Sequence, residues 1–406
     1  MTEHAAGAAP AEAQRRRALA TTCAVHFVHD GIADAIYVLL PVWAQAFGLS
    51  YAQVGVLRTA YSTALAFLQM PAGMLAERTG ERALLAGGSV LAGLAFALLA
   101  ASQSHAVLGG LILLAGVGSA VQHPLSSTII SRAYAVASRR AALGVYNFAG
   151  DIGKMVVTAA MGLGAIAIGW QNSVIVYGAL VAGVGVVALF ALSRLARQAP
   201  ASKVVHAATS ARGWGFTDRT GFALLGGIQV IDSACRTGTL TFLPFMLIAK
   251  GATVASIGFG LALVFVGGAA GKLVCGLLAE RVGILRTVIL TELATGLFVL
   301  AVIVAPLSWA MALLMPLGVA LNGTSSVLYG TVAEFVRDDR QGRSFGLFYT
   351  LGSAAGATAP LAFGLVSDLA GVPASLSLVA VLTVATVPLA LLLDPHIAKG
   401  GARAAE

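Results

Sequence analysis

Two ten-residue stretches of this chain repeat each other 203 positions apart. The first, at 73–82, reads Gly-Met-Leu-Ala-Glu-Arg-Thr-Gly-Glu-Arg, and the second, at 276–285, reads Gly-Leu-Leu-Ala-Glu-Arg-Val-Gly-Ile-Leu. Each copy ends one apolar run and begins the next. A charged turn at the same place in two apolar halves indicates that a unit of several membrane helices was duplicated.

A second internal match supports the duplication. Gly-Val-Tyr-Asn-Phe-Ala-Gly at 144–150 aligns with Gly-Leu-Phe-Tyr-Thr-Leu-Gly at 346–352, at an offset of 202 positions. Each segment begins the fifth apolar run of its half. Two separate matches at nearly one offset are difficult to obtain by chance.

The composition indicates that the apolar residues face lipid. Hydrophobic residues make up 58% of the chain and charged residues 10%, well below the roughly 25% charged residues of soluble domains. A membrane-spanning helix needs about 20 apolar residues. The sequence therefore predicts an all-α membrane protein with twelve transmembrane helices in two six-helix halves. The spans are expected at 18–46, 53–76, 83–102, 107–130, 142–165, 172–193, 220–249, 256–279, 287–304, 309–332, 344–367 and 374–393.

The basic residues set the orientation. If residue 1 is cytoplasmic, the cytoplasmic segments hold 20 of the 25 Lys and Arg residues, and the opposite loops hold only Lys250. The positive-inside rule then places both termini in the cytoplasm, as for a multi-pass protein of the bacterial inner membrane. The same rule explains the net charge of +8, so we expect no nucleic-acid partner.

The domain boundaries follow from the polar stretches. We expect a disordered cytoplasmic tail at 1–17, six-helix halves at 18–193 and 220–393, a flexible cytoplasmic linker at 194–219 and a second tail at 394–406. The first apolar run is too long for the core of a cleaved signal peptide. Cys23, Cys235 and Cys275 all lie in predicted spans, and their spacing favours buried small apolar residues over metal ligands.

The chain carries no phosphate-binding Gly-x-x-x-x-Gly-Lys-Ser/Thr loop and no extramembrane segment long enough for a catalytic domain. We therefore expect no enzymatic activity, no catalytic residues, no cofactor and no bound metal. A gradient must supply any energy that the protein uses.

The charged turn resembles the loop signature between the second and third helices of the major facilitator superfamily. With twelve spans and the weaker second copy, the resemblance covers essentially the whole chain. It implies that the acid and the basic residues of the turn pair with neighbouring helix ends and hold one conformer of a gate. Topology charges alone would explain the arginines, but neither the glycines nor Glu77. The gating residues are Gly73, Glu77, Arg78, Gly80 and Arg82, with Glu280 and Arg281 in the second copy.

Two segments resemble the fosmidomycin-resistance branch of that superfamily more narrowly. They are His-Phe-Val-His-Asp at 26–30, running on to Pro41, and Gly-Val-Gly-Ser-Ala-Val-Gln-His-Pro-Leu-Ser-Ser at 116–127. The chain departs from the branch at Leu125, where an acid is expected, and at Asp151 and Lys154, where uncharged polar residues are expected. The resemblance implies a proton-coupled exporter of small molecules.

Ionisable residues within the spans are candidates for function, because a charge at the bilayer centre costs about 2.5–3.5 kcal/mol. His26, Asp30 and Asp34 follow one another at four-residue spacing on one helix stripe, with His29 beside it. The two aspartates lie about 18 and 24 Å from the helix start, near mid-membrane. With no cation on their own face, they are expected to exchange protons, and the histidines to tune them. Alternatively, the histidines are interhelical hydrogen-bonding groups.

Further polar stripes predict a substrate site. By the resemblance, the first, fourth, fifth and seventh helices line a central cavity. Asp151–Lys154 and Asp232–Arg236 could also be simple intrahelical ion pairs. Otherwise, Lys154 and Arg236 are the best candidates to bind an anionic group. The substrate-binding candidates are Asn147, Asp151, Lys154, Gln229, Asp232, Arg236, His123 and Arg58.

Three other charged residues lie nearer the helix ends. Arg58 and Lys272 are about 9–10 Å from them, which favours snorkelling to the interface, although Arg58 could instead pair with Asp34. Glu292 lies just inside the start of its span and is interpreted as structural.

The sequence thus predicts a secondary active transporter working by alternating access, a monomer in the lipid bilayer, that exports a small polar organic compound in exchange for protons. One alternative is a proton-coupled importer of a small organic anion. An alternative from another class is a membrane sensor or scaffold that does not transport. The intramembrane charges and the gating turn argue against the sensor.

Overall fold

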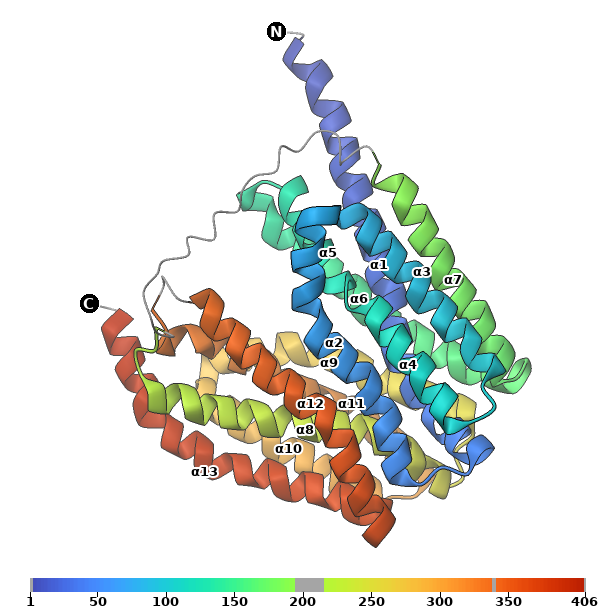
Figure 1. Ribbon diagram of the computed structural model, residues 1–406. Helices are drawn as coiled ribbons and strands as arrows, with labels where there is room; N and C mark the ends of the chain where they lie inside the picture. The colour runs from blue at the N-terminus through green and yellow to red at the C-terminus, as the bar shows by residue number, and fades with distance from the viewer. Residues whose placement is uncertain (1–2, 194–214, 338–340, 405–406) are drawn as a thin grey trace. The chain divides into compact units, whose positions relative to one another are not determined.

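The chain is helical almost throughout. A computed structural model describes residues 3–193, 215–337 and 341–404 (Figure 1). In these ranges, helices cover all twelve predicted spans, which confirms the all-α fold. Ten helical segments are long and apolar enough to cross a membrane. Of the twelve spans, α2 and α8 do not meet that criterion, and both carry charged residues within the span.

The helices have the following bounds. In the first half they are α1 (Glu3–Phe47), α2 (Tyr51–Thr79), α3 (Glu81–Leu98), α4 (His105–Ser119), α5 (Gln122–Ala133), α6 (Val136–Ala167) and α7 (Trp170–Ala191), with a short 3₁₀ turn η1 (Leu99–Ala101). In the second half they are α8 (Arg219–Ala249), α9 (Val254–Val282), α10 (Ile284–Val304), α11 (Leu307–Thr331), α12 (Gln341–Ala370) and α13 (Val372–Ala404), with the 3₁₀ turn η2 (Val332–Phe335).

The fourth span is divided between α4 and α5. The division falls at Ala120 and Val121, and Pro124 explains it. A proline ring clashes with the carbonyl group four residues earlier, which here belongs to Ala120, and it also lacks the N–H that would bond to that carbonyl. The break places His123 at the beginning of α5.

The two repeated turns have the same backbone conformation. Gly80 joins α2 to α3 with φ 86°, and Gly283 joins α9 to α10 with φ 92°. Residues with a side chain rarely adopt a positive φ, so each turn needs its glycine. The duplicated sequence therefore folds into duplicated turns.

The chain divides into two compact units. The first comprises Met1–Ile36 and Thr63–Thr209, and the second comprises Tyr37–Ser62 and Ser210–Glu406. The units differ from the predicted halves in one segment, because residues 37–62 pack with the second half. Most of the predicted linker, 194–214, lies outside the described residues, and α1 begins within the predicted tail.

In the first unit, α3 packs closely on α7. A Cβ atom added at Gly93 would lie 2.4 Å from the Ala182 nitrogen, and one at Gly178 would lie 2.4 Å from the Gly93 carbonyl oxygen. The helices thus approach to a distance that only glycine permits, as small residues allow in membranes.

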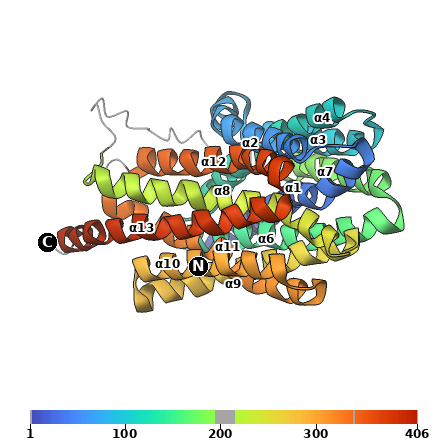
Figure 2. The ribbon, with the colours of Figure 1, turned by 90° about the horizontal axis from the view of Figure 1, so that it is seen from below.

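In the second unit, α8, α12 and α13 run side by side, and α11 packs against α9 and α10 (Figures 1 and 2). The core around Phe222, Leu328 and Phe348 lies among α8, α11 and α12. Many large apolar side chains on the outside are exposed, among them Phe67 and Leu163 of the first unit and Leu369 of the second. In a multi-pass membrane protein, such residues face lipid.

The segment 37–62 is fastened to α12 by the beginning of α2. The backbone N–H groups of Tyr51 and Ala52 donate to the two carboxylate oxygens of Asp368, at 2.7 and 2.9 Å. The ring of Tyr51 meets Phe242 and Phe245 of α8 edge-on. A carboxylate at a helix N-terminus accepts hydrogen bonds from the free N–H groups and interacts favourably with the positive end of the helix dipole.

Candidate functional site

Three predicted polar residues of the first unit meet at one carboxylate, that of Asp30. His26 Nε2 lies 3.3 Å from Asp30 Oδ2, and His123 Nε2 lies 3.8 Å from Asp30 Oδ1. Lys154 Nζ lies 3.4 Å from Asp30 Oδ2. Three helices, α1, α5 and α6, thus contribute to one cluster, and we call these four residues the Asp30 cluster.

The approach of α6 to α1 depends on a glycine. A Cβ atom added at Gly150 would lie 2.5 Å from His26 Nε2 and 2.8 Å from Asp30 Oδ2. Any side chain there would fill the space that the imidazole and the carboxylate occupy. One turn later, α6 presents Lys154 to the same carboxylate.

Although no cation lies on its own helix face, Asp30 is paired, because Lys154 supplies a positive charge from another helix. The same ammonium group lies 3.6 Å from Asp151 Oδ1 and also interacts electrostatically with Asp34. Lys154 therefore does not form a simple intrahelical ion pair, because its charge is shared among three carboxylates.

His26 is supported by Tyr146 of α6, a contact that the sequence pattern did not predict. The carbonyl oxygen of Tyr146 lies 2.8 Å from His26 Nδ1, and the phenol ring stacks on the imidazole with centroids 4.1 Å apart. The Gln122 amide donates to the Tyr146 hydroxyl at 2.7 Å. The repeated 144–150 segment marked Tyr146, but only the fold shows which histidine it contacts.

His29 belongs to a different contact. Its two ring nitrogens bond with the hydroxyls of Ser119 and Ser89, at 3.1 and 2.9 Å. Both serines are buried, on α4 and α3. This arrangement favours the interhelical hydrogen-bond interpretation of His29, and its role in proton exchange stays a prediction.

The donor atoms of His26, Asp30 and His123 all lie within 4.8 Å of one another, a spacing that could hold a metal ion. The Lys154 ammonium, 3.4 Å from Asp30 Oδ2, already puts a positive charge beside that carboxylate. The chemistry of the cluster therefore favours the lysine over a metal as the partner of Asp30.

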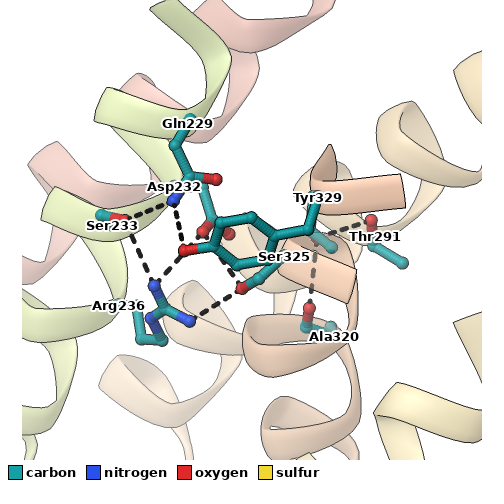
Figure 3. A network of polar contacts seen from close by, with 9 residues as sticks. Gln229, Asp232, Ser233, Arg236, Thr291, Ala320, Ser325 and Tyr329 are labelled. Carbon is teal, nitrogen blue, oxygen red and sulfur yellow. Dashed lines mark hydrogen bonds and ion pairs between the residues drawn. The ribbon is translucent and has the colours of Figure 1, made fainter. Parts of the chain in front are cut away.

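A second polar network lies in the second unit, between α8 and α11 (Figure 3). Arg236 donates to Ser325 Oγ at 2.7 Å and to Ser233 Oγ at 3.2 Å, and it lies 3.6 Å from Asp232 Oδ2. Ser325 in turn donates to Asp232 at 3.3 Å. The guanidinium group is thus held between two helices.

Gln229 completes this network on α8. Its amide donates to Ser233 at 3.1 Å and to the Tyr329 hydroxyl at 3.3 Å (Figure 3). Spacing along α8 predicted the stripe of Gln229, Asp232 and Arg236. The partners on α11, Ser325 and Tyr329, were missed because no local pattern marks them.

The structure also changes the interpretation of Glu292. This residue of α10 is 2% exposed and hydrogen-bonds both to Asp232 and to Thr324. Thr324 donates to Thr291 at 2.7 Å. Glu292 therefore belongs to the polar network of the second unit, rather than to the helix start at which the sequence placed it.

The repeats place equivalent residues in equivalent surroundings. With the offset of the charged turns, His26 corresponds to Gln229 and Asp30 to Ser233. Gly352 corresponds to Gly150, and a Cβ atom added at Gly352 would lie 2.5 Å from Gln229 Nε2. Both units therefore bring a glycine of one helix against a polar stripe of another.

Arg58 and Asn147 have different surroundings from each other. Arg58 is 8% exposed, and its guanidinium carbon lies 4.2 Å from the ring centroid of Tyr37 and 5.5 Å from that of Tyr61. The snorkelling interpretation is therefore wrong, because two aromatic faces hold the cation inside the protein. Asn147 is exposed on α6, and no described contact brings it to Lys154.

At the charged turn, the contacts differ from those expected. Glu81 pairs with Arg132 of α5 at 2.7 Å, and Arg82 donates to the carbonyl of Leu189 on α7. Glu77 and Arg78 are exposed, as are Glu280 and Arg281 in the second copy, and Gly73 is half-buried. The turn thus ties α3 to α5 and α7 through Glu81 and Arg82, and the gating role of the other residues stays a prediction.

Comparisons with known proteins agree with the fold. The structure resembles that of a bacterial homologue of the human lysosomal transporter Spinster, solved in an inward-facing, unoccupied conformation, with TM-score 0.79 and 16% identity over 95% of this chain and 98% of that one. It also resembles a mutant of the nucleoside transporter NupG, with TM-score 0.75 and 14% identity over 93% and 99% of the two chains.

One curated relative matches in sequence. It is the probable anion transporter 2, chloroplastic, of Oryza sativa subsp. japonica, which is 28% identical over 142 residues. The match covers 34% of this chain and 26% of that protein. Residues 22–225 and residues 225–406 each match the sequence model of a family described as the Major Facilitator Superfamily. The two matches meet near the beginning of α8, and together they cover nearly all of the sequence, so this chain belongs to the Major Facilitator Superfamily.

Proposed function

We propose that this chain is a proton-coupled exporter of a small polar organic compound, which it exchanges for protons by alternating access. The observation that carries the proposal is the Asp30 cluster, in which one buried carboxylate contacts two imidazoles and one ammonium group. Buried charges in a membrane are costly, and they persist where a transporter uses them.

Exchange follows from competition at Asp30. The carboxylate can hold a proton or a hydrogen-bond donor of the substrate, but it has little room for both. The anionic part of the same substrate would bind Lys154, which lies in the same cluster. Protons entering from one side would thus release the compound on that side. The resemblance of 26–30 and 116–127 to the fosmidomycin-resistance branch supports export.

A second candidate function is the symport of protons with a small organic anion. The Lys154–Asp30 contact favours it, because protonation of Asp30 would free the ammonium group to bind an anion. The relative named an anion transporter also supports it. In this mode, proton and substrate bind together instead of competing.

The distribution of basic residues supports a place in the bacterial inner membrane with both termini cytoplasmic. The monomeric state stays an expectation. Reporter fusions at the two termini and at residue 205 test the orientation. A periplasmic signal from the fusion at 205 would mean that the number of spans before it is odd.

Transport itself is tested in proteoliposomes. A thermal-shift screen of anionic, cationic and zwitterionic compounds finds a ligand, because binding stabilises the native state. Its flux is then measured under an imposed pH gradient, with a pH-sensitive dye inside the vesicles. Export predicts substrate and proton movement in opposite directions, whereas symport predicts the same direction. Substrate flux that does not change with the pH gradient would contradict both export and symport.

The Asp30→Asn variant identifies the coupling group. It keeps the shape of the side chain and removes the exchangeable charge. We expect it to bind substrate and to exchange substrate across the membrane, but to lose gradient-driven transport. Asp34→Asn serves as the matched comparison on the same helix stripe. Undiminished proton flux in the double variant would remove both residues from the mechanism.

A further inference from the structure

The second unit contains two acidic side chains in direct contact. Asp232 of α8 is 4% exposed and Glu292 of α10 is 2% exposed, and their carboxyl groups are hydrogen-bonded to each other. A hydrogen bond between two carboxyl groups needs a proton, because an ionised carboxylate can only accept. This contact is therefore compatible with one proton held between the two residues.

The charge balance points the same way. The cation that acts on both carboxyls is the guanidinium of Arg236, 3.6 Å from Asp232 Oδ2. Two ionised carboxylates with one guanidinium would leave a net negative charge in a buried site, whereas one added proton makes the group neutral. Neutralisation is how proteins accommodate buried charges that lack full compensation.

The other titratable groups around the pair do not replace that proton. Cys235 lies on α8 beside Asp232, and Tyr329 of α11 accepts from Gln229 and stacks on Tyr349 of α12 at 4.4 Å. These thiol and phenol groups add no positive charge. The neighbouring helix α13 contributes the carbonyl of Val379 and the hydroxyl of Thr383, which do not titrate, and α9 contributes Cys275, a thiol without positive charge.

We propose that Asp232 and Glu292 share one exchangeable proton and form a second proton site, in the unit that does not contain Asp30. The proposal deepens the proposed function and rests on it for its role in transport. Two such groups titrate as a pair, so the proton belongs to both residues. Loss of this proton would strengthen the ion pair between Asp232 and Arg236. Binding of the proton would weaken that ion pair and leave the guanidinium group more available to an anionic substrate group.

The test measures the proton itself. Infrared difference spectra of the purified protein, between acidic and alkaline buffer, record the carbonyl stretch of protonated carboxyl groups. We expect the wild type to show, among its pH-dependent bands, one band that is lost in Glu292→Gln and equally in Asp232→Asn. Asp394→Asn, at an exposed position of α13, is the matched control and should keep the band. Size-exclusion chromatography shows that each variant remains folded.

Two outcomes would overturn the proposal. If the band survives in Glu292→Gln, Glu292 does not hold the proton, and if it survives in Asp232→Asn, the proton is not shared. The measurement needs neither substrate nor transport. Asp30→Asn, which tests the proposed function, should leave this band in place, so each of the two ideas can fail alone.

Discussion

The ammonium group of Lys154 lies 3.4 Å from the Oδ2 atom of Asp30, on a different helix of the same unit. Both charged side chains are largely shielded from water, since Lys154 is 30% exposed and Asp30 is 10% exposed. Each group therefore depends on the other, and the pair makes α1 and α6 interdependent.

Removing only one partner should be costly. Lys154→Met leaves a buried carboxylate without its main counter-charge, a change that typically costs about 3–5 kcal/mol. The partial exposure of the lysine favours the lower end of that range. Adding Asp30→Asn should restore most of the loss. Thermal unfolding of the single variants and the double measures the coupling. Asp151→Asn with Lys154→Met is the comparison, and an equal restoration there would mean that Asp30 is not the main partner.

Four glycines of the repeated segment form a matched series. Gly150→Ala and Gly352→Ala put a methyl group 2.5 Å from His26 Nε2 and Gln229 Nε2, respectively, and overpacking of this kind costs about 1–3 kcal/mol. At Gly144 and Gly346, nothing lies within 4 Å of an added Cβ. Alanine there should stabilise the helix by roughly 0.5–1 kcal/mol. Melting temperatures of the four variants test this, and equal shifts at 144 and 150 would contradict the close approach of α6 to α1.

The Glu81–Arg132 ion pair should couple weakly. The two side chains are 19% and 41% exposed, and pairs of this kind contribute about 0.2–1 kcal/mol. A double-mutant cycle with Glu81→Gln and Arg132→Gln measures the coupling energy. High salt should reduce it, because exposed charges are screened. A coupling near zero at low salt would leave Arg132 with only a topological role.

Asp218 provides a pH-dependent helix cap. The Gly221 backbone N–H donates to its carboxylate at 3.0 Å and holds the pKa of Asp218 below its ordinary value, with His396 adding to the effect. A lowered pKa means that the stabilisation is complete above the unfolded pKa, about 3.9, and is lost as pH falls through the folded pKa. Asp218→Ala should therefore cost about 0.5–2 kcal/mol at neutral pH and progressively less in stronger acid.

The matched control for that prediction is Thr253, whose hydroxyl caps α9 by accepting from Ser256 at 3.2 Å. Thr253→Ala should have a similar cost that does not change with pH, because a threonine hydroxyl does not titrate. Thermal unfolding from neutral to acidic pH compares the two variants. Parallel curves would show that the charge of Asp218 contributes nothing.

Local sequence patterns predicted the helices and their polar faces. The duplicated turns identified Gly80 and Gly283 as equivalent, and apolar runs located all twelve spans. Pro124 would have predicted the break between α4 and α5, because its effect on the carbonyl of Ala120 is local. Four-residue spacing correctly placed His26 and Asp30 on one stripe.

The partners across helices were not predictable in this way. The spacing of α1 says nothing about which residue of α6 lies opposite, so the sequence predicted Asp151 as the ion-pair partner of Lys154 and did not predict Asp30. Glu292 and Asp232 meet because α8 and α10 pack together in the fold. In a transmembrane helix, a polar residue near one end has the same local pattern whether it supports the helix or faces another acid.

The carboxylate of Asp368 accepts hydrogen bonds from two backbone N–H groups at the beginning of α2. Helix starts cannot leave such donors without acceptors, and lipid provides none. Any state in which Tyr51 and Ala52 move away from Asp368 must therefore give them water instead. Hydration of this helix end is then a condition for the movement, and dehydrating agents should slow a step that parts α2 from α12 more than one that keeps them together.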